Sequence, residues 1–426
     1  MIPAEIISKK RDGLPLDEVE IKNFIHGYLS GDITKAQMSA LLMAIYFKSM
    51  NKDETLCLTE IMVNSGTKLD FHNSKSYVAD KHSTGGIGDK ISLILAPLMA
   101  ASGIKTPMIA GRALGFTGGT IDKLKAIPGF NTSPSLTEFK DWVDLIGAAI
   151  ISQSKEICPA DNKLYSLRNE TGTISSLPLI CSSILSKKIA EGIHGIVLDI
   201  KVGNGAFMKT KEDALELGCL MQEVGSTYGL NIDVLYTNMN QPLGRFAGLA
   251  CEVNESIECL GGNGPDDLMN ITYELGSKLL LQAKLADTKI NAIAKLKKLV
   301  ESKIALKFFN SMIENQNGNL NAFEKNLTPR YEKILYAKSS GYLNIIDTER
   351  IGWALVELGC GSKTPNDTLD YTAGINFVKK TGEEVKINEP VMRIFNSNQN
   401  RLNNTLELLL KTFIIEKSPN KTQLFL

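Results

Sequence analysis

The chain has 426 residues, 43% of them hydrophobic and 22% charged, and its 47 Lys and Arg residues balance 47 Asp and Glu residues. These shares are typical of a globular protein with two or three domains, because one hydrophobic core rarely serves a chain of this length. The balanced charge excludes the strong positive field by which proteins bind nucleic acid or an anionic membrane.

The seven cysteines are scattered and form no C-x-x-C pair, which favours reduced thiols over a disulfide framework or a zinc site. The N-terminus lacks the apolar run of a signal peptide, and no segment approaches about 18 consecutive apolar residues. We therefore expect a soluble, cytoplasmic protein with no nucleic-acid partner, no membrane partner and no bound metal.

The chain opens with a predicted unit of three helices. Asp17 precedes apolar residues at helical spacing, so it is expected to begin the first helix. Thr34 with Gln37, and Asn51 with Glu54, resemble capping boxes that begin the next two.

The stretch from Asp80 to Lys90, DKHSTGGIGDK, lies between a short predicted strand (Ser76–Ala79) and a predicted buried helix (Ile91–Ala101). A glycine-rich turn in this position directs backbone N–H groups at one point, beside the positive end of the helix dipole. Lysine and hydroxyl side chains in the same turn favour bound phosphate, and the alternative is a tight structural turn. The spacing matches neither a nucleotide-triphosphate loop nor a dinucleotide loop.

Strands and helices then alternate, which predicts a mainly parallel sheet with ligands near the carboxyl ends of its strands. A second glycine-rich passage, Gly111–Leu124, leads into a helix that Thr120 is expected to cap. The segment 161–191 is predicted to be helical and places Ser183 and Lys187 on one helix face. The further predicted strands are 105–110, 148–152, 195–203 and 232–237, and the further predicted helices are 135–147, 210–229 and those within 264–317.

A third, smaller α+β domain is expected from about Arg330. The Thr-Gly-Glu-Glu turn at 381–384, between alternating apolar residues, predicts a hairpin. The last ten residues are expected to be loosely held. The predicted class is therefore α/β with a separate all-α domain and a small C-terminal α+β domain. Residues 1–68 plus 161–191 are assigned to the helical domain, 69–160 plus 192–330 to the α/β domain, and 331–426 to the C-terminal domain.

Five motifs, in this order, carry a family resemblance: DKHSTGGIGD, GRALGFTGGTIDKL, LYSLRNETGTISSLPLICSSILSKK, DIKVGNGAF and TNMNQPLG. Along nearly its whole length the chain resembles thymidine phosphorylases and pyrimidine-nucleoside phosphorylases. The resemblance implies a nucleoside phosphorylase class II fold, in which a helical domain faces an α/β domain across a cleft that closes by hinge motion, in a homodimer. It also implies phosphorolysis in nucleoside salvage: thymidine and inorganic phosphate give thymine and 2-deoxyribose 1-phosphate, with no cofactor.

The same resemblance implies the site residues. Carbon–nitrogen cleavage through an oxocarbenium-like state puts negative charge on the leaving base, and fixed cations stabilise that charge. His82 is expected to protonate or hydrogen-bond the base, since the ordinary pKa of a histidine side chain lies near neutrality; the alternative is a histidine that only braces the loop. For Arg168 and Lys187 the alternative is that they are an ordinary surface arginine and a solvated lysine.

The implied phosphate site is Lys81, His82, Ser83, Ser92, Met108, Ala110 and Thr120. The implied base site is Arg168, Ser183 and Lys187, and the implied catalytic residues are His82, Arg168 and Lys187.

Some residues depart from the family pattern. Met108 is typical of the thymidine-preferring branch, whereas the broad-specificity branch, which also uses uridine, has lysine. Ala110 replaces a serine that helps to hold phosphate, and Phe116 replaces a histidine near the sugar.

Some relatives hold a potassium ion with Gly88, Leu243, Glu255, a threonine and an alanine. Here Lys90 replaces the threonine and Phe246 the alanine. We expect the Lys90 ammonium to take the cation position and to pair with Glu255; the alternative is that Lys90 turns outward and the site is lost.

Two rival functions remain at this stage. An anthranilate-type phosphoribosyltransferase has the same architecture but needs magnesium and an acidic pair, of which the sequence shows no convincing example. A non-catalytic binding protein is the other class, and turnover distinguishes it.

Overall fold

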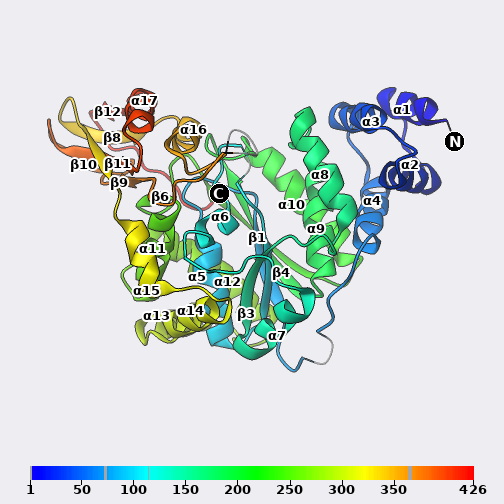
Figure 1. Cartoon of the computed structure of the whole chain (residues 1–426), viewed down its shortest axis with the longest axis horizontal. Coiled ribbons are helices and arrows are strands. Elements are labelled where there is room, and N and C mark those ends of the chain that lie inside the picture. Colours follow the sequence, from blue (N-terminus) through cyan, green and yellow to red (C-terminus); the bar gives the residue numbers. More distant parts are fainter. Residues whose placement is uncertain (1, 72–73, 114, 363–366) are drawn as a thin grey trace. The chain divides into compact units, whose positions relative to one another are not determined.

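The computed structural model describes residues 2–71, 74–113, 115–362 and 367–426 (Figure 1). The chain divides into two compact units. The first comprises residues 1–78, 153–196 and 215–233, and the second comprises 79–152, 197–214 and 234–426. Within the described ranges, no helix is both long enough and apolar enough to cross a membrane.

The first unit is built from helices. α1 packs on α3, α2 on α4, and α4 on α9, so that the N-terminal helices surround a core containing Phe24 and Met38. The capping boxes predicted at Thr34 and Asn51 are confirmed, and Asp17 forms a third. The sequence missed α1, since Ile2 at its N-cap provides no side-chain cap. The helices are α1 (Pro3–Arg11), α2 (Glu18–Ser30), α3 (Lys35–Lys48), α4 (Lys52–Asn64), α8 (Pro159–Thr171), α9 (Leu177–Ala190) and, except for its first four residues, α10 (Lys211–Ser226).

The second unit contains the central sheet. β4 lies between β1 and β5, and β2 pairs in parallel with β3. β1 also lies beside β2, because the Ala79 N–H donates to the Lys105 carbonyl at the start of β2. The apolar helix α5 packs against α11, α12, α13 and α14. The elements are β1 (Ala79–Ser83), α5 (Ile91–Ser102), β2 (Thr106–Ala110), α6 (Thr120–Leu124), α7 (Leu136–Ile146), β3 (Ala148–Ser152), β4 (Gly195–Val202), β5 (Asn231–Asn238), α11 (Ala250–Leu260), α12 (Asp266–Gln282), α13 (Lys289–Glu301), α14 (Ile304–Asn315), α15 (Leu320–Phe323) and the 3-10 helix η1 (Glu324–Leu327).

β1 begins three residues later than predicted, at Ala79 instead of Ser76. The sequence analysis assigned the charged residues Asp80 and Lys81 to the loop, but both are buried in the strand. Burial is possible there because each has a polar partner: the Lys81 N–H donates to Asp80 Oδ1 at 2.7 Å, and the Lys81 ammonium lies 3.6 Å from Asp89.

The C-terminal part is α+β, as predicted, with two antiparallel sheets. One has the order β6-β9-β11-β7 and the other β10-β8-β12. The predicted hairpin at 381–384 is wrong, since β9 pairs with β6 and β11 while β10 pairs with β8. The turn therefore connects two sheets. The elements are β6 (Phe246–Gly248), β7 (Tyr331–Tyr336), β8 (Gly341–Ile345), α16 (Thr348–Leu358), β9 (Gly374–Phe377), β10 (Glu384–Val385), β11 (Pro390–Asn396), α17 (Gln399–Leu409) and β12 (Phe413–Glu416).

The C-terminal tail is not loosely held, contrary to the prediction. The Asn238 N–H donates to the Leu424 carbonyl at 3.0 Å, and the Leu426 N–H donates to the Tyr236 carbonyl at 3.1 Å. The tail thus continues the sheet beyond β5. An unpaired strand edge offers N–H and C=O groups that gain by pairing, and local sequence composition does not reveal this.

Candidate functional site

The first glycine loop, residues 84–90, lies between the end of β1 and the start of α5. Ser83 organises it with two hydrogen bonds. Its hydroxyl donates to Asp89 Oδ2 at 2.5 Å and accepts the Gly85 N–H at 3.1 Å. The loop is therefore folded back on its own serine and has a fixed shape before any ligand binds.

The loop is also fastened to β4 behind it. The Thr84 N–H donates to the Asp199 carbonyl at 3.1 Å, and the Lys201 N–H donates to Thr84 Oγ1 at 2.9 Å. The Asp199 carboxylate pairs with the Lys201 ammonium at 2.6 Å and accepts the Thr237 hydroxyl at 2.6 Å. Asp199 and Lys201 of the motif DIKVG and Thr237 of the motif TNMN therefore have a structural role, because their contacts hold the loop in place.

Several buried charges lie beneath the loop. Burial lowers the pKa of the Lys81 ammonium, against the attraction of Asp89. Burial also opposes ionisation of Asp89, yet Lys81 and Lys201 together hold the pKa of this carboxyl well below its ordinary value. Lys123 donates to the Asp89 carbonyl at 2.7 Å and pairs with Glu252 at 2.6 Å. The loop thus rests on an ionised carboxylate surrounded by cations.

Two glycines are required by the close approach of other backbone atoms. Gly88 has φ +73°, and a Cβ there would lie 2.4 Å from the Leu243 carbonyl oxygen. In the second glycine passage, a Cβ on Gly119 would lie 2.1 Å from the Ala113 nitrogen, whose N–H donates to Asp122. Both loops therefore pack tightly enough to exclude any side chain at these positions.

The predicted phosphate residues do not all gather at one point. Because β1 extends to Ser83, side-chain alternation places Lys81 and Ser83 on one face of the strand and half-buried His82 on the other. Ser92 lies half-buried in the first turn of α5. Thr120 is the first residue of α6, and Gly119 occupies the N-cap without a side-chain cap, so the predicted Thr120 cap is wrong.

The remaining predicted phosphate residues lie on β2. Met108 is buried inside the strand, and Ala110 ends it in a half-buried position. Phe116 packs on Phe207 and Trp353, with ring centroids 5.5 and 6.1 Å apart. A histidine there would replace a ring that belongs to the hydrophobic core of the C-terminal part.

In the first unit, α9 presents Ser183 and Lys187 one turn apart, as predicted. The Lys187 ammonium donates to Ser183 Oγ at 2.9 Å and to Asp161 Oδ2 at 2.5 Å. Asp161 is fully buried, while the Lys187 side chain keeps 14% of its surface exposed. The Tyr165 ring lies with its centroid 5.9 Å from the ammonium. Lys187 is therefore held in one position and still reaches solvent.

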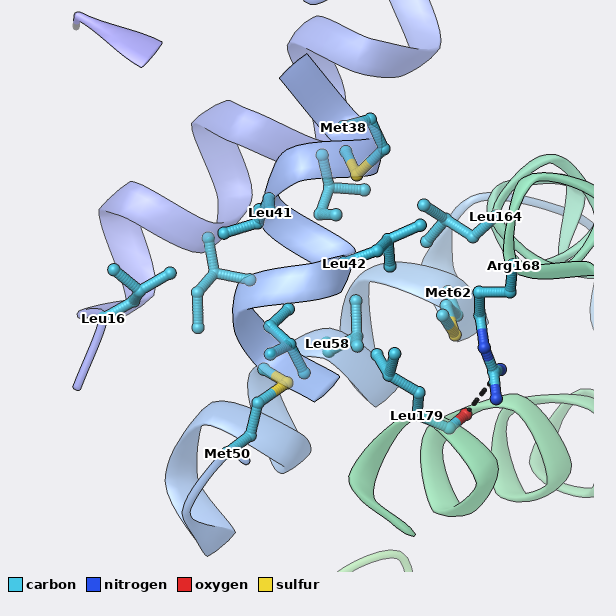
Figure 2. Close-up of a pocket in the computed structure, with 13 residues that line it drawn as sticks. Leu16, Met38, Leu41, Leu42, Met50, Leu58, Met62, Leu164, Arg168 and Leu179 are labelled. Carbon is cyan, nitrogen blue, oxygen red and sulfur yellow. Dashed lines mark hydrogen bonds between the residues drawn. The ribbon is translucent and has the colours of Figure 1, made fainter. Parts of the chain in front are cut away.

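Arg168 has a different environment from Lys187. Only 1% of it is exposed, and its guanidinium donates to the carbonyls of Ile174 at 2.7 Å, Leu179 at 2.9 Å and Thr173 at 3.5 Å. Figure 2 shows the side chain passing Leu164 to reach the Leu179 carbonyl, at the edge of an apolar cavity between helices. Burial lowers the pKa of Arg168 to about 10. In this arrangement Arg168 ties together the segment between α8 and α9.

Lys90 lies inside the second unit, with no exposed side-chain surface. Its ammonium donates to the carbonyls of Phe246 at 2.6 Å and Leu243 at 3.1 Å, and to Glu255 Oε2. Although burial opposes it, Glu255 holds the pKa of this ammonium above its ordinary value. Lys90 does not turn outward, and it forms the ion pair with Glu255 that the sequence analysis predicted.

Sequence reasoning missed the acidic partners of the predicted cations. Asp89 and Asp161 were not singled out, although each binds a predicted site residue. The signal for Asp161 is its spacing, since Asp161, Tyr165 and Arg168 recur at i, i+4 and i+7 and so share one face of α8. Asp89 carries no such signal, because it meets Lys81 only through the turn of the loop.

Family models match most of the chain. Residues 4–66 match the glycosyl transferase family helical bundle domain, and residues 75–306 match the a/b domain of the same family. Residues 342–416 match the pyrimidine nucleoside phosphorylase C-terminal domain.

Curated relatives match over nearly the whole length. The chain is 45% identical over 399 residues to a pyrimidine-nucleoside phosphorylase of Staphylococcus haemolyticus (strain JCSC1435), covering 93% of this chain and 92% of that protein. Its identity to the enzyme of the same name from Staphylococcus aureus (strain N315) is also 45%, over 398 residues and with the same coverage. Among solved structures, anthranilate phosphoribosyltransferase from Thermus thermophilus matches with a TM-score of 0.57 and 16% identity, over 73% of this chain and 99% of that chain. At this identity the likeness concerns the fold alone.

Proposed function

The chain belongs to the pyrimidine-nucleoside phosphorylase family, and from that premise we propose how its residues carry out phosphorolysis. It is a pentosyltransferase with phosphate as co-substrate. A phosphate oxygen forms a bond to the anomeric carbon of a pyrimidine nucleoside while the bond from that carbon to the base nitrogen breaks. The electron pair of the broken bond leaves with the base, and the products are the free base and a pentose 1-phosphate.

The proposal assigns the phosphate to the first glycine loop. The fixed arrangement of Lys81, Ser83 and Asp89 supports this assignment more than any other observation. Asp89 orients the Ser83 hydroxyl and attracts the Lys81 ammonium, so that both donors are in place before the anion arrives. Ser92 and Thr120 are proposed as further donors to the phosphate, since each lies in the first turn of a helix that follows a strand or loop.

The proposal assigns the base to Lys187 and Ser183. Negative charge that develops on the leaving pyrimidine is stabilised by an ammonium that is already oriented. Asp161 holds that ammonium by a buried ion pair, and Ser183 lies beside it as a further polar contact for the base. The half-buried His82 is proposed to deliver the proton to the base.

Arg168 is also proposed for the base site, and the structure suggests how it would act. Its guanidinium must exchange at least one carbonyl partner for the base if it is to contact the substrate. Without that exchange, it supports the base site by fixing the segment that leads into α9. Measuring both kcat/KM and thermal stability separates these two roles of Arg168. If Arg168 only supports the segment, Arg168→Lys lowers the stability of the protein; if it contacts the substrate, Arg168→Lys lowers kcat/KM alone, and Lys187→Arg serves for comparison.

Met108 supports a preference for deoxynucleosides such as thymidine, and broad specificity that includes uridine is the alternative. A single pocket residue discriminates by about 1–3 kcal/mol, so the preference is expected to be partial. Relative kcat/KM values for thymidine, deoxyuridine and uridine test it, and equal values would contradict it.

We also propose a cytoplasmic homodimer that acts in nucleoside salvage. The exposed aromatic and apolar side chains of α3 support the dimer: Phe47 is 74% exposed, Tyr46 39% and Met43 36%. The seven cysteines, all of them free, fit a reducing compartment. Light scattering of the wild type and of Phe47→Glu tests the dimer, because a charge in the interface should give monomers.

For the cation site, we propose that Lys90 takes the place of a bound potassium ion. Two carbonyls and a carboxylate meet its ammonium, and oxygen ligands of this kind suit a monovalent cation equally well. The enzyme should therefore be equally active in sodium and potassium buffers, and strict dependence on potassium would contradict the proposal.

One assay tests the function as a whole. The protein is incubated with thymidine, with and without inorganic phosphate, and thymine and 2-deoxyribose 1-phosphate are measured. Product that appears only with phosphate supports phosphorolysis. A binding protein gives no product, and a phosphoribosyltransferase requires a diphosphate-activated sugar instead.

A further inference from the structure

A second, separate cavity lies in the second unit, and the residues assigned to phosphorolysis take no part in it. It measures about 610 Å³ and is formed by the loops after β4 and β5, the end of β8 and the C-terminal tail. Two motifs from the sequence analysis, DIKVGNGAF and TNMNQPLG, supply the residues Asn204, Asn238 and Asn240 to its wall. A volume of this order is typical of small-molecule sites.

The hydrogen bonds of these asparagines fix which way their amides point. Asn238 Oδ1 accepts the Asn240 N–H at 2.7 Å, Asn240 Oδ1 accepts the Asn204 N–H at 2.8 Å, and Asn204 Oδ1 accepts the Thr348 N–H at 2.9 Å. A backbone N–H can donate only to the oxygen of a side-chain amide. Each of these hydrogen bonds therefore shows which terminal atom of the asparagine is the oxygen and which is the nitrogen. The oxygens are thus used by the protein.

The amide nitrogens of the wall are left as donors. Among the described residues, Nδ2 of Asn238 and of Asn240 donates to no protein acceptor within hydrogen-bond distance. The Thr381 hydroxyl accepts the Ile345 N–H at 3.0 Å and keeps its own proton to donate. Donors that are fixed in place and lack acceptors fit a ligand rich in oxygen.

The charge of the wall favours an anion. Lys421 lines the cavity, and no Asp or Glu side chain is among the described residues that line it. Lys421 lies three residues before Leu424, whose carbonyl accepts the Asn238 N–H of β5, so the tail is attached to β5 close to this lysine. Ile345 and Ile346 add an apolar part to the same wall, which suits the C–H face of a sugar ring.

We propose that this cavity binds a phosphorylated sugar. The amides and the threonine hydroxyl contact the sugar oxygens, and Lys421 contacts the phosphate. The sugar phosphate has two possible sources, a free pentose phosphate or a nucleoside monophosphate. The proposal does not depend on the proposed function, because none of these residues belongs to the glycine loops or to the base site.

Binding is tested by isothermal titration calorimetry of the full-length protein with ribose 5-phosphate. Uridine 5′-monophosphate, ribose and inorganic phosphate are titrated in parallel. The key variant is Asn238→Asp. Its carboxylate still accepts the Asn240 N–H, so the loop stays folded, but it replaces a donor by a negative charge. The matched control is Asn398→Asp, which makes the same change at the N-cap of α17, outside the cavity lining.

We expect Asn238→Asp to weaken ribose 5-phosphate binding at least tenfold, with Asn398→Asp unchanged and phosphorolysis of thymidine retained in both. Tighter binding of the monophosphate than of ribose 5-phosphate, with the same sensitivity, identifies the nucleotide as the source. The proposal is overturned if Asn238→Asp has no effect, or if inorganic phosphate binds as tightly as the sugar phosphate. It is also overturned if Ser83→Ala abolishes the binding that Asn238→Asp leaves intact, since that ligand then occupies the glycine loop.

Discussion

Replacement of Lys90 by threonine should make the protein depend on potassium. The Lys90 ammonium is fully buried and donates to Glu255 and to the carbonyls of Leu243 and Phe246. In Lys90→Thr the partners of the Glu255 carboxylate that remain within the described part of the chain are two backbone donors, the N–H groups of Arg245 and Phe246, at 2.7 and 3.2 Å. Removing one partner of a buried ion pair costs about 3–5 kcal/mol of unfolding free energy, because the other charge stays buried.

Potassium should restore part of that loss in the variant alone. An ion at about 100 times its dissociation constant stabilises the folded state by about 2.7 kcal/mol. The measurement is thermal unfolding by circular dichroism in NaCl and in KCl at equal ionic strength. We expect identical curves for the wild type, a lower midpoint for Lys90→Thr in NaCl, and a partial recovery in KCl.

Lys140→Thr is the matched control. Lys140 forms an ion pair with Asp144 at 3.1 Å on the surface of α7, and its side chain is 41% exposed. An exposed pair contributes about 0–1 kcal/mol, so this variant should unfold close to the wild type in both salts. The reasoning is refuted if Lys90→Thr is as stable as Lys140→Thr, or if the wild type itself needs potassium.

Other substitutions probe the two substrate ends and the loop. Lys187→Ala should lower kcat/KM for thymidine by at least a hundredfold in steady-state assays, because the cation that stabilises the leaving base is removed. The midpoint of thermal unfolding shows whether this variant keeps its fold. Burial lowers the pKa of Lys81 below the ordinary lysine value of 10.5, so this ammonium loses its charge at a lower pH than a solvated lysine does. The KM for phosphate should therefore begin to rise before the pH reaches 10.5. Gly88→Ala should destabilise the protein by more than about 2 kcal/mol in urea unfolding, since its Cβ would meet Leu243 at 2.4 Å. Gly103→Ala, also at positive φ but with open space around its Cβ, should cost only about 1 kcal/mol.

Each of these expectations has an outcome that contradicts it. Unchanged turnover in Lys187→Ala would remove that residue from the base site. A phosphate KM that stays flat up to pH 10.5, the ordinary pKa of lysine, would show that Lys81 does not bind phosphate as a cation. Equal stabilities for Gly88→Ala and Gly103→Ala would mean that the loop yields easily, and the rigid phosphate site would lose its support.

The helices could be predicted from local sequence because their signals are local. A capping box such as Thr34 with Gln37 satisfies backbone groups within one turn, so neighbouring residues alone decide it. The apolar run 91–101 predicts a buried helix on the same grounds, and α5 lies at Ile91–Ser102. The motifs also identified the pair of Ser183 and Lys187, since four-residue spacing on a helix places two side chains next to each other.

What the sequence alone could not decide depends on residues that are distant along the chain. Strand β1 extends through Asp80 and Lys81 because Asp89 and the sheet compensate their burial, and the tail stays in place because β5 leaves an edge open to it. The turn at 381–384 connects two sheets because each adjoining strand finds a better partner elsewhere. In the same way, the burial of Arg168 among carbonyls and the seating of Lys90 on Glu255 appear only in three dimensions. Local hydrogen bonds are decided by neighbouring residues, whereas the cost of burying a charge depends on the partners that the tertiary fold supplies.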